Sequence, residues 1–232
     1  MKTFGIIVAG GAGTRMGSNV PKQYIDVNGK PLLYYTLKAF EESDITGVSV
    51  VVAKDYLQFV LSEIIDKYGF KKVIRVCEGG AERFDSSFHA LDDLSDVAAE
   101  DDIVLIHDGA RPFVSAQFIN EMIAAVKEHG AAIAGMPVKD TIKIADADGF
   151  VAETTQRALT WQIQTPQGFR YGNILQAYQV FSRNRMRKLA TDDSMVYEAV
   201  FPEKKVKLVE ASYGNIKITT PDDLEVAKSR LK

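Results

Sequence analysis

The chain is poor in cysteine and has no long apolar run. One of its 232 residues is cysteine, which excludes an internal disulfide. No apolar stretch approaches the roughly 20 residues that a membrane-spanning helix needs. The first residues, MKTFGIIVAGG, lead straight into glycines without a small-residue cleavage site, which is typical of a first strand and not of a signal peptide. We therefore expect a cytoplasmic protein without a membrane partner.

An excess of positive charge is also missing. The formal net charge is -3, which argues against a nucleic-acid binder that neutralises phosphates over a wide face. Hydrophobic residues make up 46% of the chain and charged residues 25%, an ordinary globular balance. The length fits one large domain. We expect residues 1–232 to form a single domain, with a β-arm inserted at about 139–158.

Short β-branched runs alternate with longer amphipathic stretches along most of the chain. This alternation predicts an α/β fold whose mostly parallel sheet carries helices on both faces, a doubly wound arrangement. The predicted buried strands cover residues 4–9, 47–53, 71–77, 101–107 and 130–138. The predicted helices cover residues 31–43, 56–69, 82–94 and 116–130, with glycine stops at Gly69 and Gly130.

The segment TIKIADADGFVAETT, residues 141–155, interrupts the alternation of strands and helices. Two short runs flank Asp148 and Gly149, a pair that favours a β-hairpin with a type I′ turn, because that turn needs positive φ at its centre. A hairpin inserted into a mostly parallel α/β fold should project from the body of the domain. An isolated two-stranded ribbon is only marginally stable in water. The sequence leaves two partners open: the hairpin's own domain, or a second subunit.

A glycine-rich turn follows the first predicted strand, in the motif IIVAGGAGTRMG. Such a turn usually receives phosphate, because glycines let backbone N–H groups approach oxygen closely. The spacing does not match a P-loop. It also fails the dinucleotide fingerprint, because after Gly11 and Gly13 the register position holds Met16, Gly17 comes one residue late, and Pro21 interrupts the helix that should follow. A dinucleotide dehydrogenase is therefore disfavoured.

Two cations belong to the same turn. Arg15 lies within it and Lys22 follows in the motif PKQ. Open α/β folds bind ligands at the carboxyl edge of the sheet, where this turn is expected. Solvated surface charges would be the ordinary interpretation of such residues. Beside a phosphate-type loop, however, a pair of cations favours a polyanion such as a triphosphate.

Further motifs extend this pattern over nearly the whole chain: AGGAGTRMG…PKQY, EGGAERFDSSFHAL, IHDGARPF, PVKDTIK, WQIQTPQGFR, TDDSMV and GNIKITTPDDL. With these motifs in this order, the chain resembles the 2-C-methyl-D-erythritol 4-phosphate cytidylyltransferases, nucleotidyltransferases of the non-mevalonate isoprenoid pathway. The resemblance implies a Rossmann-like sheet, the use of CTP and Mg²⁺, and a homodimer joined by a projecting β-arm. The hairpin at 141–155 falls where that arm would be.

The resemblance also implies where the nucleotide binds. It assigns cytosine and ribose recognition to Gly80 and Ser86, and to the stretch from Ala9 to Gly11. Gly13 belongs to the same CTP-binding turn. Asp108 ends a predicted buried strand at the carboxyl edge, and a single carboxylate together with phosphate oxygens and water suits Mg²⁺. A helix N-cap is the alternative role for Asp108.

The second substrate is a polyol phosphate, and its phosphate needs cations of its own. Arg157, just after the hairpin, and Lys217 hold the family positions that orient this phosphate. Thr141 and Thr165 would add hydroxyl groups, and Arg111 is expected to reach the same anion. Each of these residues alone would be commonplace on a protein surface.

Several other residues receive structural interpretations. Glu82 and Arg83 are expected to pair on the surface, and Thr191 is expected to cap a helix. The stretch WQIQTPQGFR, residues 161–170, is interpreted as a loop stiffened by its tryptophan and glutamines.

The sequence offers no Ser-His-Asp or Cys-His constellation, and the implied reaction does not need one. A phosphate monoester has a second pKa of about 6, so it is already mostly a dianion at neutral pH. Its oxygen can attack the α-phosphorus of CTP directly. Arg15, Lys22, Arg157 and Lys217 would then act by positioning and charge.

Two other functions remain open at this point. A ribitol 5-phosphate cytidylyltransferase would share most of the motifs, and the choice of polyol depends on few contacts. A catalytically silent nucleotide-binding module is the alternative from a different class. The set formed by Arg15, Lys22, Asp108, Arg157 and Lys217 argues against it.

Overall fold

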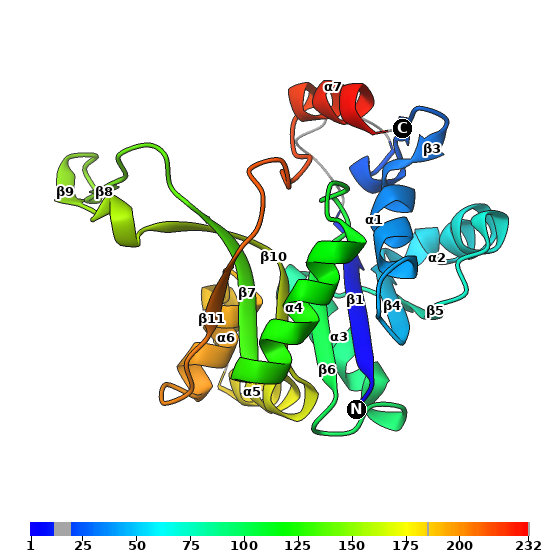
Figure 1. Ribbon diagram of the computed structural model, residues 1–232, viewed down its shortest axis with the longest axis horizontal. Coiled ribbons are helices and arrows are strands. Elements are labelled where there is room, and N and C mark those ends of the chain that lie inside the picture. The colour runs from blue at the N-terminus through cyan, green and yellow to red at the C-terminus, as the bar shows by residue number, and fades with distance from the viewer. Residues whose placement is uncertain (12–19, 185, 232) are drawn as a thin grey trace.

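The computed structural model describes residues 1–11, 20–184 and 186–231. A central sheet carries helices on both faces, as the sequence predicts for an α/β fold (Figure 1). The strands are β1 (Thr3–Ala9), β2 (Asp26–Val27), β3 (Lys30–Pro31), β4 (Gly47–Val52), β5 (Val73–Glu78), β6 (Ile103–Asp108), β7 (Ala131–Pro137), β8 (Lys143–Ala145), β9 (Val151–Thr154), β10 (Trp161–Arg170) and β11 (Lys207–Glu210). The helices are α1 (Leu32–Glu41), α2 (Leu57–Phe59), α3 (Arg83–Asp93), α4 (Ala116–His129), α5 (Tyr171–Arg183), α6 (Asp193–Val200) and α7 (Pro221–Arg230).

The main sheet has seven strands in the order β11-β7-β10-β6-β1-β4-β5 within the described residues. β1 pairs in parallel with β4 on one side and with β6 on the other, so the strand order reverses direction there. β10 is antiparallel to both of its neighbours, β6 and β7. All five predicted strands are present, and the mostly parallel, doubly wound sheet is confirmed. β5 was predicted to be buried, but it is an edge strand and none of its residues is fully buried.

Each face of the sheet has its own hydrophobic core. Consecutive residues of a strand point to opposite faces, and in β1 Ile7 joins the core under α1 and α4, whereas Ile6 joins the core under α3, α5 and α6. Because both faces are covered, the predicted strands read as continuous apolar runs without polar alternation. Figure 1 shows α4 in front of the sheet and α5 and α6 behind it.

Three of the four predicted helices form as α1, α3 and α4. In α4, the Ser115 hydroxyl accepts the backbone N–H of Phe118, and Gly130 ends the helix with φ of 83°. The fourth segment is less regular, because α2 passes directly into a π-helix over Val60–Asp66. In the described residues no helix is both long and apolar enough to cross a membrane.

The hairpin of β8 and β9 projects from the body at the left of Figure 1. Its apolar side chains stay exposed, with Phe150 at 72% and Val151 at 63%. The predicted type I′ turn is wrong: Gly149 has φ of 86°, but Asp148 is not among the residues with positive φ. Instead, the Asp146 carboxylate accepts the backbone N–H groups of Asp148 and Phe150 and shapes a longer loop.

Two interpretations from the sequence are wrong in this part of the chain. Residues 161–170 form β10 between β6 and β7, whereas a loop was expected. The motif contains Pro166, which normally argues against a central strand, and the pairing with β7 shifts register between Ile163 and Gln167. The cap of α6 is Asp192, whose carboxylate accepts the N–H of Met195, whereas Thr191 was expected to cap it.

The C-terminal residues return to the beginning of the chain. Ile218 and Ala227 pack with Val27, Leu32 and Tyr35 in a third, smaller core. α7 therefore lies over β2 and β3, beside the carboxyl edge of the sheet (Figure 1). This packing carries the segment before α7, which contains Lys217, across the ends of the parallel strands.

Candidate active site

A cavity lies at the carboxyl ends of β1 and β6, where the strand order reverses. Ligands of open α/β sheets bind at such a switch point. The cavity measures about 380 Å³, within the range of roughly 300–1,000 Å³ that is usual for small-molecule sites. The described residues that line it are Val8, Ala9, Gly10, Gly11, Lys22, Gln23, Gly80, Ala81, Glu82, Arg83, Ser86, Asp108, Ala110, Lys217 and Thr219.

Eight of the residues proposed from the sequence meet in this cavity. They are Ala9, Gly10, Gly11, Lys22, Gly80, Ser86, Asp108 and Lys217. Arg15 and Gly13 lie outside the described residues. The cavity therefore joins the first glycine turn, the second glycine turn, the end of β6 and the C-terminal segment.

The first glycine turn is hydrogen-bonded to Gln23, the residue after Lys22. The amide nitrogen of Gln23 donates to the carbonyl oxygens of Ala9 at 2.6 Å and Gly11 at 3.0 Å. Lys22 and Gln23 belong to a short 3-10 helix, Lys22–Tyr24, whose Tyr24 ring is buried and stacks on Tyr56. The lysine thus follows the turn in sequence and is held beside it in space.

The second glycine turn leads into α3. The backbone N–H of Gly80 donates to the Ser86 hydroxyl, which in turn donates to the carbonyl of Glu82, both at 3.1 Å. A Cβ atom at Gly80 would lie 2.2 Å from the Cβ of Asp85, so only glycine fits this turn. The turn presents backbone to the cavity wall, a surface that can face a flat base.

Asp108 is surrounded by cations. Its carboxylate lies 2.9 Å from Lys217 Nζ, 3.2 Å from Arg83 Nε and 3.6 Å from Arg111 Nε, and the residue is 7% exposed. Burial raises the pKa of Asp108, but the charges of Arg83, Lys217 and Arg111 outweigh it and hold the pKa well below its ordinary value. Asp108 is therefore ionised at neutral pH.

Arg83 is a cavity residue that the sequence interpretation missed. It does not pair with Glu82 on the surface: it bridges Asp108 and the fully buried Asp193, which it meets at 3.0 and 2.7 Å. Burial lowers the pKa of Arg83, but Asp193 and Asp108 outweigh it and raise the pKa well above its ordinary value. Tyr178 also donates to Asp193, at 2.5 Å. The motif TDDSMV supplies this anchor from α6.

Thr165 lies behind Asp108 and not in the cavity. Its hydroxyl accepts the backbone N–H of Asp108 at 3.1 Å and meets Nδ1 of His107 at 3.1 Å. Burial lowers the pKa of His107 to about 4, so this histidine is neutral at pH 7. Its Nε2 faces the carbonyl of Arg111 and must carry the proton, so Thr165 donates to Nδ1. The hydroxyl group of Thr165 is therefore occupied by hydrogen bonds that join β10 to β6.

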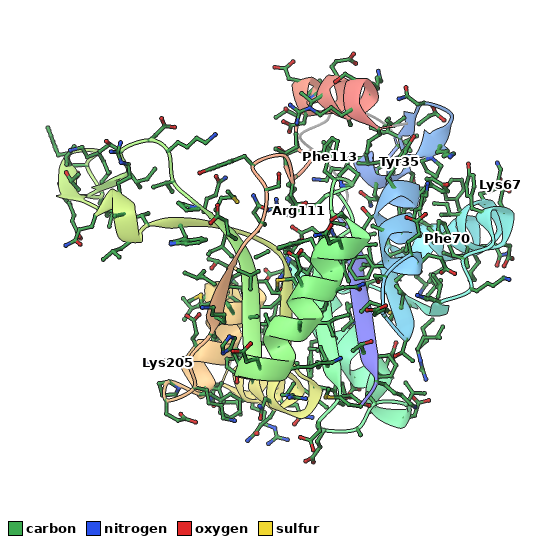
Figure 2. The ribbon with its side chains drawn as sticks, in the orientation of Figure 1. Tyr35, Lys67, Phe70, Arg111, Phe113 and Lys205 are labelled. Atoms are coloured by element: carbon green, nitrogen blue, oxygen red, sulfur yellow. The ribbon has the colours of Figure 1, made fainter. Side chains whose placement is uncertain are left out.

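Arg111 connects Asp108 to the C-terminal segment. Its guanidinium donates to the carbonyl of Asn215 at 2.8 Å, and Figure 2 labels it close to the segment that precedes α7. The Asn215 amide in turn donates to Gln164 and to the carbonyl of Thr165. Arg111 borders a neighbouring hollow of about 310 Å³, which also includes Lys217. Lys217 therefore faces both spaces.

The two residues proposed on the arm are not in the cavity. Thr141 and Arg157 are exposed, and Arg157 begins a short 3-10 helix, Arg157–Leu159, between β9 and β10. The arm projects away from the carboxyl ends of β1 and β6 (Figure 1). This chain by itself does not bring Arg157 to Lys22 and Lys217.

The donor set around Asp108 limits how a metal could bind. The described residues contain no cluster of three or more His, Cys, Asp or Glu side chains able to hold an ion. One carboxylate is compatible with Mg²⁺ when phosphate oxygens and water supply the remaining ligands. The chemistry of the cavity thus suits an anionic, phosphate-bearing ligand that brings most of the ligands for an ion itself.

Comparisons with known proteins agree with this geometry. The 2-C-methyl-D-erythritol 4-phosphate cytidylyltransferase family matches residues 4–232. The cytidylyltransferase of that name from Lachnospira eligens is 46% identical over 98% of both chains.

Solved structures extend the likeness. A 4-diphosphocytidyl-2C-methyl-D-erythritol synthase from Anaerococcus prevotii is 34% identical, with a TM-score of 0.85 over 98% of this chain and 95% of its own. The 2-C-methyl-D-erythritol 4-phosphate cytidylyltransferase from Francisella tularensis is 31% identical, with a TM-score of 0.82 over 100% of both chains. The resemblance seen in the sequence motifs is confirmed, and the chain belongs to the 2-C-methyl-D-erythritol 4-phosphate cytidylyltransferase family of CTP-dependent nucleotidyltransferases.

Proposed function

We propose that this chain transfers the cytidylyl group of CTP to the phosphate of 2-C-methyl-D-erythritol 4-phosphate. A phosphate oxygen of the polyol forms a bond to the α-phosphorus of CTP. The bond from that phosphorus to the bridging oxygen breaks, and pyrophosphate leaves with the electron pair. The supporting observation is the convergence of two glycine turns, Lys22, Lys217 and Asp108 on one cavity in a chain of this family.

The main obstacle to this reaction is repulsion between two anions. Unit charges about 4 Å apart at an effective dielectric constant of 20 repel by roughly 4 kcal/mol. Lys22 and Lys217 line the same cavity and would offset this repulsion, with Arg15 proposed to join them from the adjoining turn. Fixed cations and backbone N–H groups stabilise charge in the transition state without reorganising. No general base is needed, because the nucleophile is already ionised.

The nucleoside is proposed to lie against the second glycine turn. Gly80 exposes backbone that can pair with a base edge, and Ser86 holds that backbone in place. Ala9, Gly10 and Gly11 line the same cavity next to this turn, and Gly13 is proposed to belong to the same CTP-binding loop. The triphosphate would then run from this wall towards Lys22.

Asp108 is the proposed protein ligand for Mg²⁺. When bound, the ion would neutralise phosphate charge and orient the leaving pyrophosphate. Since Lys217, Arg83 and Arg111 already pair with Asp108, its affinity for the bare ion should be low. We therefore expect the ion to bind tightly only together with CTP.

The arm is proposed to complete the site of a second copy in a homodimer. Residues 1–232 would act as one domain, and the insertion at about 139–158 would carry Arg157 and Thr141 to the polyol phosphate of the partner. Exposed apolar side chains at Phe150 and Val151 support this proposal, because burying them on another copy is favourable. Arg111 and Lys217 would meet the same phosphate from within the chain.

The test is release of pyrophosphate from CTP. Purified chain with Mg²⁺ should release pyrophosphate with 2-C-methyl-D-erythritol 4-phosphate and much less with ribitol 5-phosphate. Replacing CTP by ATP, GTP or UTP should reduce turnover strongly. Turnover only with ribitol 5-phosphate would reassign the substrate. CTP binding without release of pyrophosphate in the presence of either polyol phosphate would identify a silent nucleotide-binding module.

A further inference from the structure

Gln23, the glutamine of the PKQ motif, lies in the cavity wall and has no part in the proposed reaction. Gln23 is 2% exposed and lines the cavity beside Lys22. Its amide nitrogen donates both hydrogens to backbone carbonyls, at 2.6 Å to Ala9 and 3.0 Å to Gly11. These two carbonyls flank Gly10, where the first glycine turn leaves β1. One buried side chain therefore fixes the backbone at the exit of the strand.

A turn that receives phosphate has to hide its carbonyl oxygens. Backbone N–H groups attract an anion, whereas a carbonyl oxygen facing the same anion repels it. By binding the carbonyls of Ala9 and Gly11, Gln23 holds both oxygens on the side of its own amide. The amide is neutral, so it adds no charge that would compete with Lys22 for the phosphate.

The same side chain joins two parts of the site. Gln23 belongs to the 3-10 helix Lys22–Tyr24, and this helix is anchored by the buried Tyr24, whose ring centroid lies 4.7 Å from that of Tyr56. Lys22 precedes Gln23 directly in the chain. The hydrogen bonds of Gln23 therefore set the position of Lys22 relative to the glycine turn.

We propose that Gln23 is a positioning residue for the triphosphate of CTP, which it serves by orienting the glycine turn and Lys22 before the nucleotide binds. This inference rests on the proposed function only for the identity of the nucleotide. It predicts a defect in CTP binding and little defect in binding of the polyol phosphate.

The test compares Gln23→Met with Gln167→Met. Methionine keeps the length of the side chain and removes both donors. Gln167 is a matched control, because it is 1% exposed and bonds Asp192 and Ser194 outside the cavity. Calorimetry with CTP should give a dissociation constant raised roughly ten- to a hundredfold for Gln23→Met, because the carbonyls of Ala9 and Gly11 lose the donor that orients them. Gln167→Met should lose thermal stability but keep the dissociation constant for CTP.

A second variant separates positioning from general damage. In Gln23→Glu the ionised carboxylate cannot donate, but a protonated one can donate one hydrogen bond, and burial raises the pKa of such a carboxyl group. The affinity of Gln23→Glu for CTP should therefore recover, relative to Gln23→Met, as the pH falls from about 8 to about 6. KM for the polyol phosphate should stay within about threefold of wild type in both variants.

The outcomes are distinct. Unchanged affinity for CTP in Gln23→Met overturns the proposal, and so does an equal rise in both substrate constants or a pH dependence shared by both Gln23 variants. Wild-type pyrophosphate release tests the proposed function separately. If that turnover were absent, calorimetry with CTP would still decide the role of Gln23.

Discussion

The cavity at the end of β1 and the arm formed by β8 and β9 differ in whether their charged and apolar side chains find partners within the chain. In the cavity wall, Asp108 is 7% exposed and its charge is matched by neighbouring cations from three parts of the chain. On the arm, Phe150 is 72% exposed and Arg157 is exposed as well. The cavity is thus organised within one chain, whereas the arm offers apolar surface and a cation to something outside it.

This difference indicates that the cavity depends on the fold of one chain, whereas the arm depends on contact with another surface. A site held by buried ion pairs and core packing should keep its geometry in a single chain. An exposed two-stranded ribbon gains stability when it packs on another surface. We infer that nucleotide binding depends on the fold of one chain, and that use of the polyol phosphate depends on assembly.

The largest expected effect is the loss of Lys22. The Lys22→Ala variant should lower kcat/KM at least about a hundredfold, because a fixed cation that faces developing charge is removed. Its melting temperature should stay within about 2 °C of wild type. Lys38→Ala is the control, since Lys38 is an exposed residue of α1 paired with Glu42, and it should retain full activity. Near-normal turnover of Lys22→Ala would show that this lysine does not stabilise charge in the reaction.

The next prediction tests whether the arm serves a partner. Lys22→Ala and Arg157→Ala are each expected to be nearly inactive alone. When the two variants are coexpressed, a mixed dimer contains one of its two sites without either change, so isolated mixed dimers should show about half of wild-type turnover. Turnover is measured on dimers isolated with two different affinity tags. If the mixed dimers stay inactive, each site takes its lysine and its arginine from the same chain.

A smaller effect is expected on assembly. Phe150→Asp should shift the protein towards monomer, because a charge replaces an apolar side chain that we expect to be buried between copies. Light scattering coupled to size-exclusion chromatography measures the mass. Leu189→Asp is the control, because Leu189 is 59% exposed and lies outside the arm. An unchanged mass for Phe150→Asp would remove its side chain from the proposed interface.

The last prediction concerns thiol reactivity and has no expected effect on turnover. Burial raises the pKa of Cys77 on β5 to about 11, so at pH 8 its alkylation should be roughly a hundredfold slower than that of an ordinary thiol. The rate should rise about tenfold per pH unit up to that pKa, because only the thiolate reacts. Mass spectrometry of the alkylated protein follows the rate.

A second thiol extends the comparison to the arm. In Phe150→Cys the new thiol should react rapidly in dilute monomer and slowly in dimer. A Cys77 that reacts as fast as an exposed thiol at pH 8 would contradict the raised pKa of its half-buried thiol.

The sequence predicted the parallel part of the fold because its strands are buried on both faces and read as apolar runs. It failed at β10, where Pro166 and three glutamines look like a loop. Gln164 and Gln167 are buried there because Asn215, Asp192 and Ser194 pair with them. Such partners are distant in sequence, so no local pattern reveals them.

The candidate site was predictable to a similar extent. Glycine turns with adjoining cations indicate an anion site, and among the described residues the cavity contains Gly10, Gly11, Gly80 and Lys22. Arg83 was misread because its partners, Asp108 and Asp193, lie 25 and 110 residues away. Thr165 was assigned to substrate, yet its hydroxyl is engaged with His107 and the backbone of Asp108. Motif membership identified Thr165 as a candidate site residue without telling which way its side chain points.

The most direct test of the account is a crystal structure with CTP and Mg²⁺. We predict the triphosphate beside the backbone of Gly10 and Gly11 with Lys22 in contact, and the base against Gly80. A nucleotide bound in another hollow of the molecule, with the turn after β1 and Lys22 both away from its phosphates, would contradict the central claim.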